Sequence, residues 1–250
     1  MAMAPALREL LSDEGIARLV SEAAPFARAF ARVLPAATVV PALAVRGTPP
    51  QVRFAVALAL SAPIAAAFPW TAGVDPPLAL MLVSDALRGI PLAILLATPL
   101  WVATHIGAIA DVLRGAPEAT IAPPPAAEGA RTPLATLTAL LVASAWLSSG
   151  GVVRALHLLS ASGPRGASPI SPGVAPWALA ARALTDGMRL SIALSAGVLV
   201  AATTLEVALA AIGRAGAPLS PQPIAVVARP LVAVIALGLS IEMAIAFLVR

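Results

Sequence analysis

Long apolar stretches with almost no charged side chains make up most of this chain of 250 residues. The clearest stretch runs from Leu190 to Ile212 and carries Glu206 as its one charged residue. About 20 apolar residues in a helix are enough to cross a bilayer. Charged residues make up 11% of the whole chain, whereas a soluble domain carries about 25%. The sequence therefore predicts an all-α integral membrane protein.

Prolines and glycines interrupt most of these stretches, so we expect broken, kinked helices. A straight helix from Leu78 to Ile109 would contain Pro91 and Pro99, each of which removes a backbone hydrogen bond, and we expect two broken segments there. Gly150-Gly151 predicts another break within the stretch 134–159. Non-helical backbone at membrane depth is tolerated only where it is buried in protein or lines a water-filled cavity. The breaks therefore favour a pore or a gate.

The chain divides at a linker rich in Gly, Pro and Ser, residues 162–176. Residues 1–23 predict a short surface helix, and not a signal peptide, because acidic residues interrupt any apolar region. Residues 24–161 form an N-terminal helical half that contains a Pro-rich loop, residues 116–131. Residues 177–250 form a C-terminal pair of helices.

Two arginines lie one turn apart near the start of the first predicted membrane helix, Ala24 to Val45. Arg28 and Arg32 can extend to the membrane interface as anchors. Alternatively, they can form a polar face that packs on a partner subunit.

Ionisable residues inside apolar stretches are the candidate functional groups, because an embedded charge is expensive in lipid. Asp85 and Arg88 are three residues apart and can pair on one helix face. The C-terminal half adds Glu206, Arg214 and Glu242 to this set.

A second group of candidates ends the predicted helix before the Pro-rich loop. Asp111 and Arg114 can neutralise each other, and Gly115 ends the helix. Gly107 shares a face with Asp111 and lets another helix approach closely. After the loop, Thr132-Pro133 predicts a new helix with Thr132 as its N-terminal cap.

Signatures of enzymes and of cofactor sites are absent from the sequence. It contains no nucleophile elbow, phosphate-binding loop or HExxH motif, and it has no Cys. The only two histidines, His105 and His157, have no converging ligand set, so we expect no catalytic residue, metal or cofactor. The net charge of +4 is spread along the chain without a basic cluster, which argues against a nucleic-acid partner.

In their order and spacing these features resemble the T subunit (SctT/FliR family) of the bacterial type III secretion and flagellar export gate. That family has Gly-x3-Asp-x2-Arg-Gly after an apolar segment with a Pro-Phe-Trp-like motif, and then a Ser-Pro-Leu helix start. The corresponding residues here are Pro99-Leu100-Trp101, Gly107, Asp111, Arg114, Gly115, Thr132-Pro133-Leu134, Gly150-Gly151, Ser160, Glu206 and Arg214, with Arg32, Pro35 and the stretch from Arg46 to Phe54 earlier in the chain. The resemblance covers residues 26–240. Departures from the pattern are Leu100 in place of an aromatic residue, Ala210 at a usual glycine, Arg229 in place of a lysine, Pro221-Gln222 later than usual, and Arg88-Gly89 as the remnant of a Lys-Glu region.

The resemblance implies one subunit of a helical assembly in the bacterial inner (cytoplasmic) membrane, surrounded by lipid. Its partners would be R (FliP-like) and S (FliQ-like) subunits, the switch/autoprotease export subunit, and the unfolded proteins that an injectisome or flagellum exports. By position, residues 116–131 would be a plug loop that restricts the pore, and its triple proline would stiffen it without needing hydrogen-bond partners. The plug candidates are Pro117, Glu118, Pro123, Pro124, Pro125, Glu128 and Arg131.

Two other functions remain open from the residues alone. A small-solute or ion-coupled transporter would use Asp111, Glu206 and Glu242 as embedded acids, although no inverted repeat is visible. The second of these functions is that of a membrane-embedded assembly factor, which would conduct neither solutes nor proteins.

Overall fold

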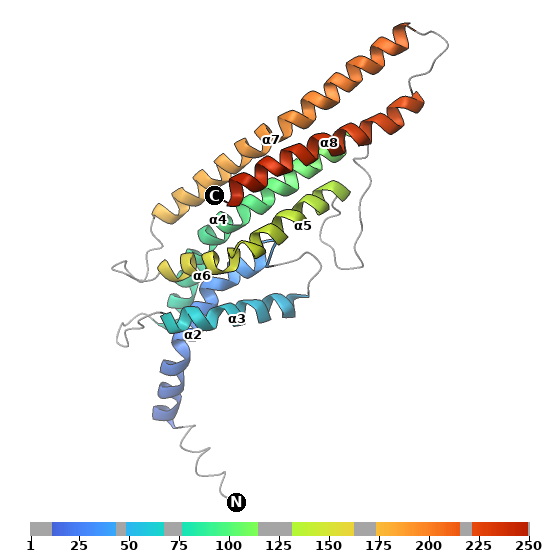
Figure 1. The fold of residues 1–250 in the computed structure, drawn as a ribbon. Helices are drawn as coiled ribbons and strands as arrows, with labels where there is room; N and C mark the ends of the chain where they lie inside the picture. The colour runs from blue at the N-terminus through green and yellow to red at the C-terminus, as the bar shows by residue number, and fades with distance from the viewer. Residues whose placement is uncertain are drawn as a thin grey trace, which may run out of the picture.

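The structure, a computed structural model, describes residues 12–43, 49–67, 77–114, 132–162, 174–215 and 222–249. The regular elements in these ranges are all helices, which confirms the predicted all-α fold. They are α2 (Asp13–Val39), α3 (Pro50–Ala67), α4 (Leu78–Leu113), α5 (Pro133–Ser148), α6 (Gly151–Ala161), α7 (Val174–Ala215) and α8 (Gln222–Val249) (Figure 1).

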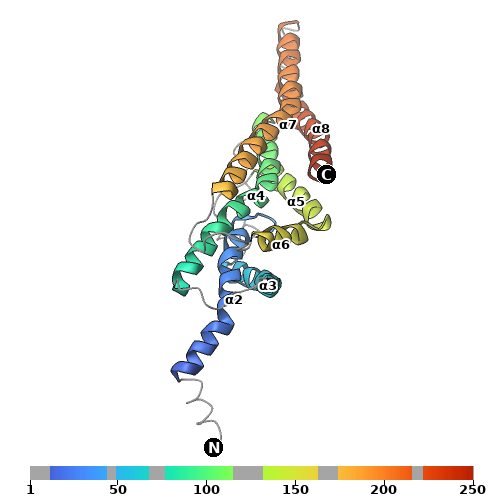
Figure 2. The ribbon, with the colours of Figure 1, turned by 90° about the vertical axis from the view of Figure 1, so that its left-hand side faces the viewer.

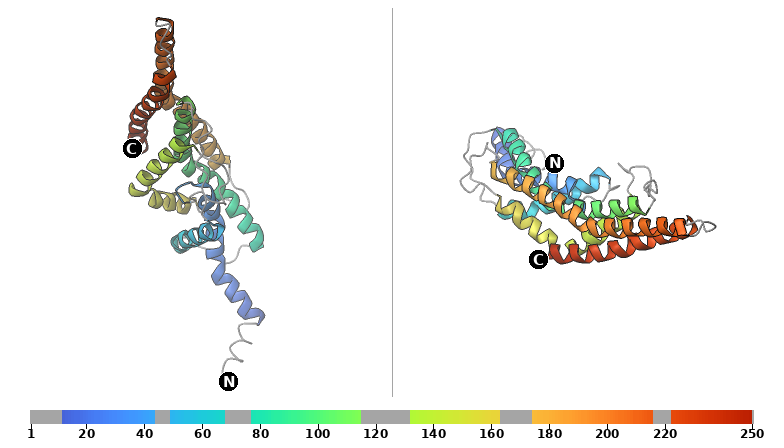
Figure 3. Two further views of the ribbon diagram at one scale, coloured as in Figure 1. Left: turned by 90° about the vertical axis from the view of Figure 1, so that its right-hand side faces the viewer. Right: turned by 90° about the horizontal axis from the view of Figure 1, so that it is seen from above.

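Helix α4 is the centre of an elongated molecule. It packs against α2, α5 and α7 along its length, and to a smaller extent against α8 and α6. The views in Figures 2 and 3 place α2 and α3 toward one end of the molecule and the α7–α8 hairpin at the other. Helix α4 therefore connects two ends of the protein that are far apart in space.

The buried apolar residues form two clusters, which we call the first core and the second core. The first core consists of Ala29, Val33, Ala36, Ala37, Val40, Ala57, Ile64, Leu92, Ala93, Leu96, Ala97, Leu100, Ala103, Val142, Ala155 and Leu159. The second core consists of Val102, Ile106, Ala110, Leu134, Val198 and Leu237. Many members of the first core are alanines, whose small size lets helix backbones approach closely in a membrane protein.

The predicted break between Leu78 and Ile109 is wrong, because α4 is one helix of 36 residues with Pro91 and Pro99 inside it. Helix α2 likewise contains Pro25 and Pro35. A proline inside a helix costs about 3 kcal/mol, but neighbouring helices in a membrane protein can compensate for the freed backbone groups. Packing of α4 against several other helices thus outweighs the tendency of the two prolines to break it.

The predicted break at Gly150-Gly151 is confirmed. Helices α5 and α6 meet there at an angle of 71°. Gly150 has a φ of 78°, in the left-handed region that favours glycine. A Cβ at Gly151 would overlap the indole ring of Trp146. The two glycines therefore break the helix in the folded protein, as their conformational freedom predicts.

Two other predicted boundaries lie inside continuous helices. Helix α2 runs across the predicted junction at residues 23 and 24, and it ends at Val39 and not at Val45. Helix α7 begins at Val174, within the predicted linker of residues 162–176.

Three of the described helices, α4, α7 and α8, are long and apolar enough to cross a membrane, and the bent α5–α6 pair is a possible fourth. Helix α7, with 42 residues, is about 63 Å long, whereas the hydrocarbon core of a bilayer is about 30 Å thick. The structure is that of a multi-pass membrane protein in which α7 must tilt or extend beyond the hydrocarbon layer.

Candidate functional site: buried charges along the central helix

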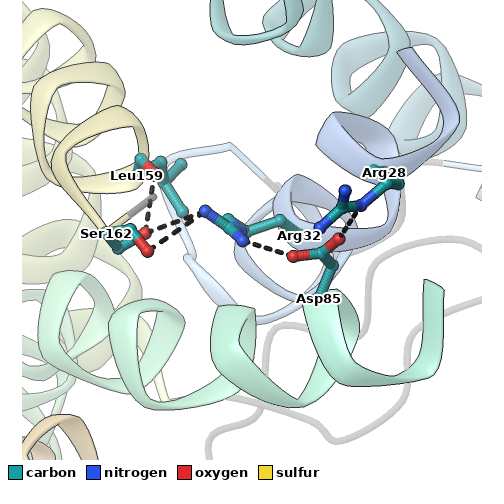
Figure 4. Close-up of polar contacts among 5 residues, drawn as sticks. All are labelled: Arg28, Arg32, Asp85, Leu159 and Ser162. Atoms are coloured by element: carbon teal, nitrogen blue, oxygen red, sulfur yellow. Dashed lines mark hydrogen bonds and ion pairs between the residues drawn. The ribbon is translucent and has the colours of Figure 1, made fainter. Parts of the chain in front are cut away.

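The first polar site joins α2 to α4 inside the protein. Both carboxylate oxygens of Asp85 accept from arginines: Oδ2 from Arg28 Nε at 2.7 Å and Oδ1 from Arg32 Nη2 (Figure 4). The side chains of Arg32 and Asp85 are each 1% exposed. Paired in this way, the charges can be buried without the penalty of an isolated ion.

Arg32 extends this site to the end of α6. Its Nη1 donates to the backbone oxygen of Ser162 at 3.2 Å, and Ser162 Oγ donates to Leu159 O at 2.7 Å (Figure 4). A cation at the C-terminus of a helix is favourable because the last carbonyl groups have no partner within the helix. One guanidinium therefore links α2, α4 and the C-terminus of α6.

The sequence did not reveal this arrangement. Arg32 is not an interfacial anchor but a buried group, and the side chain it pairs with belongs to the same chain. Its partner Asp85 lies 53 residues away in sequence. Arg88, which the sequence suggested as a partner for Asp85, is also buried on α4. The nearest sequence signal was the close spacing of Arg28 and Arg32, but nothing in the sequence identified their acid.

The second polar site joins the C-terminus of α4 to the N-terminus of α5. Asp111 Oδ2 accepts from the backbone N–H groups of Leu134 at 2.7 Å and Ala135 at 3.2 Å. Its Oδ1 lies 2.6 Å from Arg114 Nε, and the Asp111 side chain is fully buried. The predicted pairing of Asp111 with Arg114 is therefore present, and the acid also caps the next helix.

The prediction that α5 begins with Thr132 and Pro133 is confirmed, but the predicted cap by the Thr132 side chain is not formed. Thr132 occupies the N-cap position with Pro133 after it, but its side chain makes no capping hydrogen bond. Asp111 supplies the acceptor from a different helix, where its negative charge also complements the helix dipole.

Gly107 brings α4 and α5 close enough for this cap. A Cβ at position 107 would lie 2.5 Å from Leu134 O and 2.7 Å from Ala135 Cα, and it would overlap Thr138 Oγ1. That hydroxyl donates to Ala103 O across the interface at 2.8 Å. The predicted close approach at Gly107 is confirmed.

The third polar site lies on the α7–α8 hairpin. Arg229 Nε donates to Glu206 Oε1 at 2.6 Å and Nη2 donates to Oε2 at 3.0 Å, so the pair is bidentate. Both side chains remain about half exposed in the isolated chain. Arg214 and Glu242 are also exposed in the chain taken alone.

The remaining predicted residues, Gly115 and those of the loop 116–131, lie outside the described residues. Within the described ranges, no group of three or more His, Asp or Glu side chains converges as a metal site would. Two of the three acids that a transporter would need are already engaged, since Asp111 caps α5 and Glu206 pairs with Arg229.

The part of the chain that the structure describes is helical, and three or up to four of its helices are long and apolar enough to cross a membrane, which defines a multi-pass membrane protein. Residues 23–250 match the model of the family described as bacterial export proteins, family 1, and the chain belongs to this family. Its role is therefore in bacterial protein export. A search of curated proteins finds no match for the chain.

Proposed function

We propose that this chain is the T subunit of a type III secretion or flagellar export gate, and that it forms part of the inner-membrane channel for unfolded proteins. The observation that carries the proposal is the family match over residues 23–250. The geometry supports it, because Gly107, Asp111 and Arg114 act together at one helix junction. These residues are among those on which the resemblance to the T subunit rests.

Residues 116–131 restrict the pore in this proposal. The support is their position in the sequence: they follow the junction at Asp111 and precede the helix that Asp111 caps. Their prolines and small side chains suit a narrow passage. The segment itself lies outside the described residues.

The partners are R-type and S-type gate subunits and the switch/autoprotease export subunit. The half-exposed Glu206–Arg229 pair on a membrane-spanning hairpin supports an assembly, because a charged pair is costly where it faces lipid. Protein or water must surround that face in the working state.

Copurification tests the proposal. A tagged chain solubilised from its native membrane should be recovered with two other small membrane proteins, and deletion of its gene should abolish export until the wild-type gene is restored. A chain that is stable alone or as a homo-oligomer and mediates solute uptake would instead be a transporter. A chain required for assembly but absent from the finished complex would be an assembly factor.

A further inference from the structure

The two hydrophobic cores meet on α4 within a few residues. The last α4 member of the first core is Ala103, and the first α4 member of the second core is Val102. Helices α2, α3 and α6 contribute to the first core, and α7 and α8 contribute to the second. Helix α5 is divided in the same way, with Val142 in the first core and Leu134 in the second.

A proline lies about one turn before this boundary on α4. Pro99 has no N–H to donate to the carbonyl of the preceding turn. On either side of it, Thr98 Oγ1 donates to Ile94 O at 2.8 Å and Thr104 Oγ1 donates to Leu100 O at 2.9 Å. Threonine hydroxyls bound in this way often bend helices.

Polar anchors hold α4 on each side of the boundary. Asp85 fixes its first half to α2, and Asp111 fixes its last turns to α5. Each anchor includes a buried ion pair, so each end of α4 is firmly attached to its own neighbours.

An apolar groove beside the boundary leaves room for movement. The groove has a volume of about 230 Å³ and lies between α4 and α7. Its lining includes Thr98, Trp101, Val102 and His105 of α4 and Gly187 and Met188 of α7. Gly187 makes the close contact with α4, since a Cβ there would lie 2.5 Å from Thr98 Cγ2 and 3.2 Å from Val102 Cγ2. Between residues 175 and 186 of α7, only Ala180 is buried.

We propose that α4 is a hinge at Pro99, about which the half of the protein around the first core and the half around the second core move as two units. Bending changes the width of the groove while the Asp85 and Asp111 anchors stay intact. This inference concerns the chain itself and does not depend on which assembly the chain enters.

Distance measurements between spin labels on α4 test the hinge. Because the chain contains no Cys, double cysteine variants are labelled only at the chosen sites. Leu87 and Val112 are suitable, since they are exposed and lie on opposite sides of Pro99. The reference pair is Ile192 and Ile212 on α7, which are exposed and have no proline between them. The full chain is measured in nanodiscs.

In the wild type we expect a broader distance distribution for the α4 pair than for the α7 pair. Pro99→Ala should narrow it and shift it toward the value for a straight helix, about 38 Å for 25 residues. Pro91→Ala is the matched control, because Pro91 lies inside the same helix but about two turns further from the boundary between the cores, and it should leave the distribution unchanged.

Two results would overturn the hinge. A wild-type α4 distribution as narrow as that of α7 would show a rigid helix, and this measurement needs no proline variant. Equal narrowing by Pro91→Ala and Pro99→Ala would show that the bend is not located at the boundary between the cores.

Discussion

Asp111 and Leu134 are joined by a hydrogen bond of 2.7 Å that runs from the first turn of one helix to a carboxylate on another. The same carboxylate is the counter-ion of Arg114. One acid thus satisfies unpaired N–H groups at the start of α5 and neutralises a charge at the end of α4. It fixes the two helix ends between which residues 115–131 are inserted.

Asp111→Ala should lower the stability of the chain and the yield of its export complex. It removes the cap and leaves Arg114 without its acid, and loss of one member of a buried pair costs about 3–5 kcal/mol. Asp111→Asn keeps an acceptor for α5 and should have a smaller effect. Complex yield and thermal unfolding in detergent are the measurements. Wild-type yield and export in both Asp111→Ala and Arg114→Ala would refute the structural role of the pair.

Asp85→Ala should be at least as damaging, because it leaves Arg28 and Arg32 inside the protein without their shared acid. The matched control is Asp186→Ala on α7, whose ion pair with Arg189 is 3.7 Å long and largely exposed. Exposed pairs contribute little to stability. A shift in unfolding temperature should therefore appear for Asp85→Ala and not for Asp186→Ala; equal shifts would contradict the buried site.

Gly107→Ala should separate α4 from α5. The new methyl group would overlap backbone and side-chain atoms of α5, and overpacking of this kind costs about 1–3 kcal/mol. Gly238→Ala on α8 is the control, because a Cβ there would have no atom of another described helix within 4 Å. If both variants unfold at the wild-type temperature, α4 and α5 do not depend on close contact at Gly107.

Glu206 and Glu242 should face protein or water, and not lipid, in the assembled complex. Glu206→Ala should reduce complex yield because it leaves Arg229 without its carboxylate. Exchanging the charges, with Glu206→Arg and Arg229→Glu together, should restore part of that yield. Cysteines placed at 206 or 242 should not cross-link to photoreactive acyl chains, and efficient cross-linking at either position would disprove the assignment.

Deletion of residues 119–129 should leave the complex assembled while raising leakage of ions or small dyes through the closed gate. The junction at Asp111 remains in this variant, so α4 and α5 keep their contacts. Conductance or dye uptake in cells is the measurement, with complex yield as the control for assembly. An assembled complex as tight as the wild type would place the seal elsewhere and make the segment an ordinary connector.

The fold class follows from the composition of the chain, because long apolar stretches leave only helices as a way to satisfy the backbone in a membrane. Features that depend on neighbouring residues along one helix could also be predicted. Gly150-Gly151 breaks the helix as predicted, and Asp111 pairs with Arg114 at a spacing of three residues.

Which groups meet across helices depends on how the whole chain packs. Asp85 binds arginines more than 50 residues away, and Asp111 replaces Thr132 as the cap of α5. Packing also allows α4 to continue through Pro91 and Pro99. Burial against neighbouring helices offsets the cost of a proline inside α4. Burial also makes an unpaired charge or N–H group expensive, so such groups find partners on other helices. Neither effect can be predicted from residue spacing along a single helix.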